Sequence, residues 1–177
     1  NRIITIEDNG CGMTEEELDK NLGTIARSGS MLFKEENGKQ ADIDIIGQFG
    51  VVFYSSFMVA KEVVVESKSV DSDKAYKWQS KGVEGYSIEE CSKEGFGTKI
   101  TLHIKDNTDE ETYDQYLDKY AVKMLIKKYS DYIRYPIKME NEVINSMIPI
   151  WKKDKKSITE EEYNEFYKEK FYDFENP

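Results

Sequence analysis

The chain has 177 residues and a formal net charge of −10. This acidic balance repels a phosphate backbone, and the basic residues are interleaved with acidic ones, so nucleic acid is excluded as a first hypothesis. No apolar run is long enough to cross a bilayer, which excludes a membrane span. Cys11 and Cys91 match no metal-ligand spacing, and one pair builds no disulfide framework. We therefore expect a cytoplasmic protein without a bound structural metal.

The first predicted element is a strand, Arg2–Glu7, and the absence of a starting Met indicates a fragment of a longer protein. A glycine-rich turn, Asp8–Gly12, follows this strand. Thr14 and Glu17 then form the signature of a capping box, which predicts a helix ending near Leu22.

The next stretch, residues 23–40, is polar and punctuated by glycines, so we expect a mobile segment there. A helical pattern over Phe53–Ala60 comes after it. Strand patterns then follow one another with short links, which require antiparallel pairing because a parallel return needs a long crossover. These strands are predicted at Val63–Val65, Tyr76–Gln79, Tyr86–Glu90 and Lys99–Lys105.

A second capping-box signature, Thr108 with Glu111, predicts a helix that runs to about Ile133. The tyrosines and apolar residues of this helix recur at helical spacing, and we interpret them as core. A short edge strand is predicted at Tyr135–Glu140.

The last predicted helix begins at a third capping-box signature, Thr159 with Glu162. We expect no packing partner for it within this chain, so we assign it to a following domain. The predicted elements together give an α+β fold, a two-layer sandwich with helices on one face of a mostly antiparallel sheet.

Glycine-containing turns carry the chemical interpretation. An aspartate at the end of a strand, as in Asp8–Met13, can accept a hydrogen bond from an exocyclic amine, and glycines let a flat ring approach the backbone. The glycines of Gly47–Phe53 precede a helix, where backbone N–H groups can point at an anion. In the third turn, Gly97–Thr98, the Thr98 hydroxyl could face the same ligand cavity as the other two turns. Each turn taken alone is equally consistent with an ordinary structural turn.

Taken together, the segments resemble the 90-kDa heat-shock chaperone family, within the superfamily of gyrase, histidine-kinase and MutL ATPases. The segments that carry the resemblance are Asp8–Thr14, Asn21–Gly29, Ile46–Ser55 and Gly97–Ile100. The second of them is not shared with the gyrase or kinase branches. The resemblance continues into Ile158–Tyr167, which is similar to the start of that family's middle domain. The short connector favours the bacterial, high-temperature protein G type.

The resemblance implies a Bergerat-type ATP-binding domain at residues 1–140, lacking its first helix and strand, with a lid at about 23–50. A connector at 141–156 and the start of the middle domain at 157–177 would follow. The implied function is the ATP-binding part of a heat-shock chaperone ATPase, which couples ATP binding and hydrolysis to the folding of unfolded client proteins. The intact family member would act as a homodimer in the stress response.

The resemblance also implies roles for individual residues toward ATP or ADP and its Mg²⁺. Asp8 would bind the adenine amino group with help from Thr98, while Gly12 gives clearance. The base and sugar pocket would be lined by Met13, Leu22 and Phe53. The sugar and phosphates would lie near Asn21, Arg27 and Ser28, and the phosphate-facing loop would be formed by Gly47, Gly50, Val51 and Val52.

Two departures from the family pattern stand beside this interpretation. The family's Mg²⁺-binding Asn and water-activating Glu lie on a helix before Asn1, so we assign no catalytic and no metal-binding residue in this chain. Val52 occupies the position of the family's third glycine. If that position needs positive φ, valine costs about 1–2 kcal/mol and weakens ATP binding by roughly tenfold. The alternative function is therefore an interaction module that binds no nucleotide.

Overall fold

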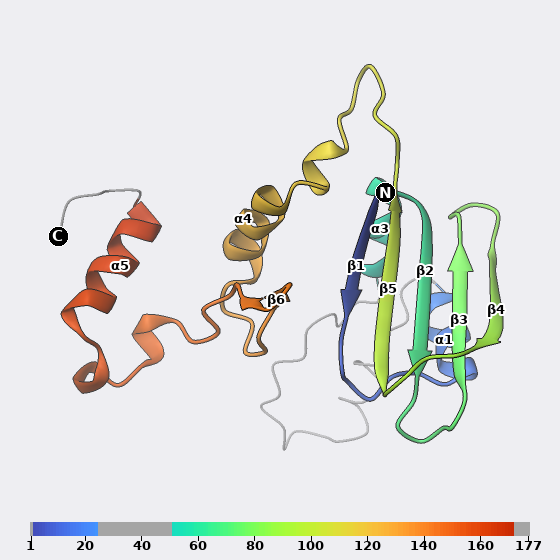
Figure 1. Ribbon diagram of the computed structural model, residues 1–177, viewed down its shortest axis with the longest axis horizontal. Coiled ribbons are helices and arrows are strands. Elements are labelled where there is room, and N and C mark those ends of the chain that lie inside the picture. The colour runs from blue at the N-terminus through green and yellow to red at the C-terminus, as the bar shows by residue number, and fades with distance from the viewer. Residues whose placement is uncertain (1, 25–50, 172–177) are drawn as a thin grey trace. The chain divides into compact units, whose positions relative to one another are not determined.

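The computed structural model describes residues 2–24 and 51–171 (Figure 1). The chain divides into two compact units, residues 1–117 and 118–177, and each is described by itself. The predicted lid at 23–50 lies almost wholly outside the described residues. The domain limits at 140 and 156 remain predictions.

The described residues of the first unit form a five-stranded sheet with the order β1-β5-β2-β3-β4. All four pairings are antiparallel, as the short links predicted. β2 pairs with β3 and β3 with β4, and β5 then returns between β1 and β2 (Figure 1). The strands are β1 (Ile3–Glu7), β2 (Ala60–Lys68), β3 (Ala75–Ser80), β4 (Tyr86–Cys91) and β5 (Gly97–Ile104).

The first helix, α1 (Glu15–Leu22), begins with the predicted capping box. Its two reciprocal bonds join the Glu17 amide to the Thr14 hydroxyl (3.3 Å) and the Thr14 amide to the Glu17 carboxylate (2.8 Å). The helix predicted at Phe53–Ala60 is shorter than expected. It is a 3₁₀ turn, Phe53–Ser55, followed by α3 (Ser56–Val59), because Ala60 already belongs to β2.

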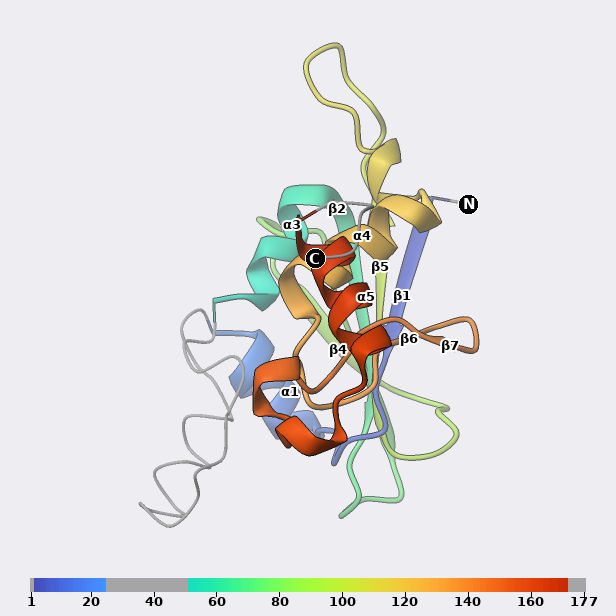
Figure 2. The same cartoon turned by 90° about the vertical axis from the view of Figure 1, so that its left-hand side faces the viewer.

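Both helices lie against the same face of the sheet (Figure 2), which gives the predicted two-layer α+β architecture. Alternation along β2 directs Val63 and Val65 toward the helices, where both are fully buried. Leu18 of α1 and Trp78 of β3 complete the centre of this core. The hydrophobic core of the first unit therefore lies between the helices and one sheet face.

The opposite face of the sheet is polar. One row across it alternates in charge from strand to strand, because Lys99 pairs with both Glu7 and Glu66, and Lys77 pairs with both Glu66 and Glu89. Lys99 Nζ lies 3.2 Å from the Glu66 carboxylate and Lys77 Nζ lies 2.5 Å from that of Glu89. Opposite charges on neighbouring strands stabilise a sheet. This row makes the face opposite the helices polar.

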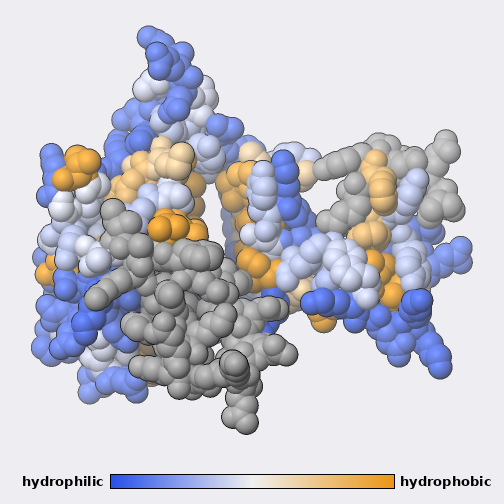
Figure 3. Space-filling view, turned by 180° about the vertical axis from the view of Figure 1, so that it is seen from behind, coloured by the Kyte–Doolittle hydropathy of each residue, from blue (hydrophilic) through white to orange (hydrophobic). Residues whose placement is uncertain are grey.

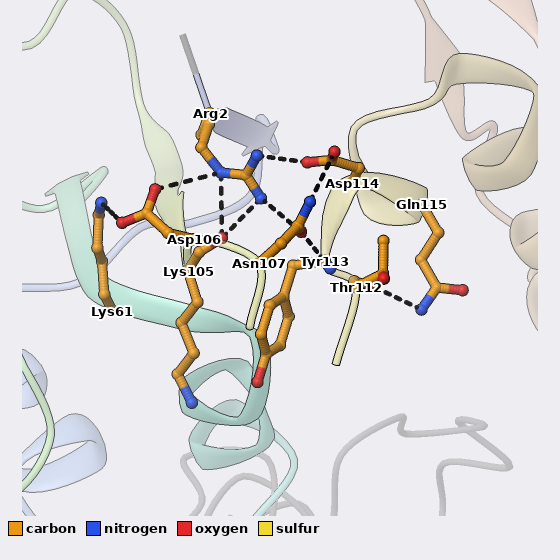
Figure 4. Close-up of polar contacts among 9 residues, drawn as sticks. All are labelled: Arg2, Lys61, Lys105, Asp106, Asn107, Thr112, Tyr113, Asp114 and Gln115. Carbon is orange, nitrogen blue, oxygen red and sulfur yellow. Dashed lines mark hydrogen bonds and ion pairs between the residues drawn. The ribbon is translucent and has the colours of Figure 1, made fainter. Parts of the chain in front are cut away.

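A polar clasp joins the start of β1 to the segment that follows β5 (Figure 4). The Arg2 guanidinium donates to the Lys105 carbonyl (2.7 Å) and to the Asp114 carboxylate. Asn107 donates to the second oxygen of Asp114 (2.8 Å) and accepts the Tyr113 amide (2.8 Å). The clasp thereby holds the residues from Lys105 to Asp114 against the edge of the sheet.

We predict that acid weakens this clasp. The hydrogen bonds from Asn107 and Arg2 lower the pKa of Asp114 below its ordinary value. A lowered pKa means that the stabilisation is present at neutral pH and is lost as the pH falls through the folded-state pKa. Amide-exchange protection of residues 105–114 should therefore fall on acidification below about pH 4, the ordinary range of an Asp carboxyl. An Arg2→Gln variant should show low protection at both pH values, and full protection in that variant at pH 7 would contradict the clasp.

The prediction of a helix starting after Thr108 is wrong. The Thr108 hydroxyl does accept the Glu111 amide (3.0 Å), but the bond closes a turn rather than a helix. The first α-helix of the second unit, α4 (Lys119–Ser130), begins later and is capped by the Asp118 carboxylate, which accepts the Ala121 amide at 2.7 Å.

The aromatic stripe that we interpreted as one helical core face is accordingly divided. Tyr113 is buried in the core of the first unit, where Tyr116 and Leu117 also pack. Tyr120 and Met124, on α4, are 72% and 40% exposed. The prediction of a continuous buried stripe is therefore wrong beyond Leu117.

The predicted edge strand at Tyr135–Glu140 is reduced to β6 (Lys138–Met139), which pairs with β7 (Glu142–Val143). The buried Asn145 side chain organises the residues before it. Its amide group donates to the carbonyls of Ile133 (2.7 Å) and Tyr135 (2.9 Å), and its oxygen accepts the Ile137 amide (2.7 Å).

The last helix, α5 (Glu160–Phe171), starts with the predicted capping box of Thr159 and Glu162. Our expectation that it has no packing partner is wrong. Phe166 makes an edge-to-face contact with Trp151 (6.2 Å between ring centroids), and Lys153 Nζ lies 2.7 Å from the Glu162 carboxylate. The partner comes from residues that we had predicted to be a connector.

Candidate nucleotide-binding site

The aspartate of the first glycine-rich turn continues the register of β1. The Asp8 amide donates to the Thr98 carbonyl (2.9 Å), one step beyond the last β1–β5 pair. Since side chains alternate between faces, Asp8 lies on the helix-covered face, in the row that Thr98 begins. The Asp8 side chain is exposed, and its Oδ1 accepts the Gly10 amide (2.8 Å) in an Asx turn. The carboxylate is thus held at the end of the sheet and accessible from outside.

Two glycines allow this turn to lie close to the neighbouring strands. Gly12 has φ +67°, and a Cβ there would meet the Lys68 carbonyl oxygen at 1.9 Å. Gly97 has φ +102°, and a Cβ there would meet the Asp8 carbonyl oxygen at 2.1 Å. A hydrogen bond from the Val70 amide to the Cys11 carbonyl (2.8 Å) adds a further attachment. The clearance that we assigned to Gly12 is therefore needed first by the backbone of the protein itself.

A buried hydroxyl pair lies behind the turn. Thr98 is 8% exposed and Ser67, its neighbour on β2, is completely buried. The two hydroxyl oxygens are 2.9 Å apart, and the Met13 amide donates to the Ser67 hydroxyl at 2.9 Å. Ser67 was missed from the sequence. The signal that could have found it is the alternation Val63, Val65, Ser67, which places its side chain on the same face as Thr98.

Helix α1 brings two predicted residues to this side of the sheet. Leu22 is buried in the core, and the Asn21 amide group lies 4.0 Å from the Met13 sulfur. Phe53 packs against the same core, 5.5 Å from Trp78 between ring centroids. The structure therefore places Asn21 beside Met13, and Leu22 and Phe53 in one core. Leu22 is buried in this core and Phe53 is partly buried against it.

The end of α1 is also joined to the segment that carries Phe53. The Tyr54 hydroxyl donates to the Leu22 carbonyl (2.8 Å), which satisfies a carbonyl of the last helical turn. Burial raises the pKa of Tyr54, so the phenol stays a neutral donor at physiological pH. This bond holds the two ends that flank residues 25–50 near each other.

Val52 does not have the positive φ that would make a valine costly at this position. Val52 has φ −62° and ψ −39°, an ordinary right-handed helical conformation, and it precedes the 3₁₀ turn. Val51 and Val52 are 48% and 66% exposed. Seen from behind, the surface of the described residues carries separate apolar patches with hydrophilic surface between them (Figure 3). The condition for that conformational cost, a positive φ at this position, is therefore not met, and the hypothesis that Val52 weakens ATP binding now depends on a clash with a bound phosphate.

The remaining predicted site residues cannot be placed. Arg27, Ser28, Gly47 and Gly50 lie outside the described residues. Within the described ranges, 2–24 and 51–171, no group of three or more His, Cys, Asp or Glu side chains could hold a metal ion. No helix in those ranges is long and apolar enough to span a membrane.

The sheet, the helices on one of its faces and the turn at its end agree with the comparison to known families. A family model described as "Histidine kinase-, DNA gyrase B-, and HSP90-like ATPase" matches residues 1–112. This is more than half of the chain, and the chain belongs to this ATPase family.

Within this family, the chain is a homologue of bacterial chaperones over its whole length. It is 54% identical to "Chaperone protein HtpG" of Clostridium acetobutylicum and of Clostridium botulinum, and 52% identical to that of Shouchella clausii. Each alignment has 196 positions and takes in 100% of this chain. The chain spans 31% of the length of these relatives, so it corresponds to the ATPase part of a chaperone.

Proposed function

We propose that the chain is the adenine-nucleotide-binding part of an HtpG-type chaperone. The observation that carries this proposal is the row formed by Asp8 and Thr98 at the end of β1 and β5. An exposed carboxylate that accepts hydrogen bonds lies in the same cross-strand row as the buried Thr98 hydroxyl, which can donate or accept them. The edge of adenine presents an amino donor beside a ring-nitrogen acceptor, and this row complements that edge.

The chemistry of these groups fits a nucleotide base. Asp8 would hold the amino group of the base, Thr98 would contact the ring edge, and Met13 and Asn21 would lie beside the base and sugar. Bound ATP would supply the phosphates and bring Mg²⁺ with it. The described residues contain no cluster that would hold the metal on its own, so we assign it no protein ligand here.

We extend the proposal to the whole protein because the chain is homologous to HtpG chaperones. In the intact chaperone, ATP binding and hydrolysis would drive the binding and folding of unfolded client proteins by a cytoplasmic homodimer. The relatives are chaperone proteins of the HtpG type, which supports this role.

The proposal is tested by titrating ADP into the chain in a calorimeter, with Asp8→Asn as the variant. Asparagine keeps an oxygen for the Gly10 amide, so the turn should survive. A hydrogen bond to a charged group is worth about 1.5–3 kcal/mol. The substitution should therefore weaken ADP binding by roughly 10- to 100-fold.

Asp73→Asn is the matched control, because Asp73 is also exposed, lies outside the site, and its replacement changes the net charge equally. This control should bind ADP as the parent chain does. Unchanged affinity of Asp8→Asn would reject the assignment of the base site. A parent chain that binds no ADP would instead favour the interaction module.

A further inference from the structure

Ser67 is a buried polar residue to which neither the sequence interpretation nor the proposed function gives a role. It lies on β2 directly across from Thr98 on β5, and its side chain has no exposed surface. A buried hydroxyl must find hydrogen-bond partners, and Ser67 has three of them. These are the Met13 amide, the Thr98 hydroxyl and the Gly97 carbonyl.

The single proton of Ser67 has two acceptors within reach, the Thr98 oxygen and the Gly97 carbonyl. The Met13 amide can only donate, so Ser67 accepts from it at 2.9 Å. The Ser67 oxygen is 2.9 Å from the Thr98 oxygen and 3.3 Å from the Gly97 carbonyl. Bonds between a hydroxyl and an oxygen are normally 2.5–3.0 Å long, so the Thr98 oxygen is the better acceptor. The 2.9 Å contact between the two hydroxyls admits either of them as the donor. We take Ser67 as the donor to Thr98. In the opposite arrangement Thr98 would donate to Ser67 and Ser67 to the Gly97 carbonyl, and the comparison of two ligands below separates the two cases.

This assignment has a consequence for Thr98. Its oxygen receives the proton of Ser67, so its own proton is free to donate elsewhere. The result is a chain of donors that runs from the Met13 amide through Ser67 to Thr98. Each bond in such a chain polarises the next one and strengthens it.

We propose that Ser67 is a positioning residue that makes the Thr98 hydroxyl a hydrogen-bond donor toward the adenine ring. This inference rests on the proposed function. The Asp8 carboxylate can only accept, which suits the amino group of adenine, and a donating Thr98 suits the adjacent ring nitrogen N1, directly or through a water. Ser67 would thus contribute to the choice of base without touching it.

The test compares ADP with 1-deaza-ADP, which keeps the amino group but has a carbon in place of N1. Ser67→Ala removes the donor to Thr98 and should fold, because it is smaller and leaves the strand backbone intact. It should weaken ADP binding by about tenfold and leave 1-deaza-ADP binding nearly unchanged. A purely structural role would weaken both ligands equally, and that result would overturn the proposal.

Ser80→Ala is the matched control. Ser80 is also a buried strand serine, and its hydroxyl donates to the Gly85 carbonyl (2.6 Å) and accepts the Gly82 amide (3.0 Å), away from Thr98. The Ser80→Ala variant should bind ADP and 1-deaza-ADP as tightly as the parent chain does. In a Thr98→Val background, Ser67→Ala should cause no further loss of ADP binding, because the effects of substitutions at two interacting residues on the binding free energy do not add. An equal loss in both backgrounds would overturn the proposal.

A measurement without nucleotide separates this inference from the proposed function. Ser67→Ala should accelerate hydrogen exchange of the Met13 amide in the free chain, whereas Ser80→Ala should not. Unchanged exchange at Met13 would overturn the donor chain whether or not ADP binds. A parent chain that fails to bind ADP but shows the accelerated exchange would reject the nucleotide assignment and keep the hydrogen-bond chain.

Discussion

Replacing Gly97 by alanine is expected to destabilise the sheet by about 2–5 kcal/mol. The residue has φ +102°, where an L side chain costs about 1–2 kcal/mol. The new Cβ would also lie 2.1 Å from the Asp8 carbonyl oxygen and 2.9 Å from the Asn9 Cα. These are backbone atoms that cannot swing aside, and forcing extra atoms into a packed site typically costs a further 1–3 kcal/mol, roughly.

Gly95→Ala provides the control for strain alone. Gly95 also has positive φ, +68°, but nothing lies within 4 Å of the position that its Cβ would take. This substitution should cost only about 1–2 kcal/mol. The free energies are best obtained from hydrogen exchange of the slowest β2 and β5 amides, which report on this sheet and not on the second unit. Equal losses in the two variants would show that the close contact between Gly97 and Asp8 does not limit stability.

The elements that local signals encode were predicted from the sequence. The capping boxes at Thr14 and Thr159 each need only residues three apart, and both helices begin where these pairs predict. Strand alternation and short links gave the antiparallel hairpins in the same way. Their order in the sheet follows from contacts between distant residues, which a single sequence does not display.

The capping-box signature at Thr108 shows the limit of a local signal. The same side-chain bond forms there, yet the chain does not continue as a helix. The Tyr113 amide is bound by Asn107, which in turn contacts the Arg2-bound Asp114, and Tyr113 enters the core. Arg2 and Asp114 are 112 positions apart, so no short window of sequence could reveal this competition.

The candidate site was predicted in part for a similar reason. Asp8, Gly12 and Thr98 stand in glycine-rich turns that are visible in the sequence, and the structure brings them to one end of the sheet. Ser67 reads as an ordinary strand residue until the β2–β5 register places it beside Thr98. The φ of Val52 could not be predicted from the sequence, because the residue type that a family prefers at a position does not fix φ.

Trp78→Ala is expected to destabilise the first unit by about 3–5 kcal/mol, the range found when a large buried aromatic side chain is truncated. Trp78 is 1% exposed and lies in the core of the first unit. Its ring lies edge-to-face with Phe53 (5.5 Å) and stacks on Tyr86 (5.7 Å), so it connects β3 and β4 with the segment that leads into α3. A loss of this size is a large fraction of the 5–15 kcal/mol, roughly, that stabilise a typical domain.

Trp78→Phe should cost much less, and the reason is specific to this indole. Its Nε1 is buried and has no hydrogen-bond partner among the described residues. An unpaired buried donor is itself unfavourable, so removing it offsets part of the lost apolar contact. Hydrogen exchange of the β2 and β3 amides gives the loss of stability in both Trp78 variants. Trp151→Ala is the control, because Trp151 is 65% exposed and lies in the second unit, so its replacement should leave the exchange of these amides unchanged. A Trp78→Ala cost below about 1 kcal/mol would mean that the core closes without this side chain, whereas a Phe variant as unstable as the Ala variant would mean that the indole N–H is satisfied after all.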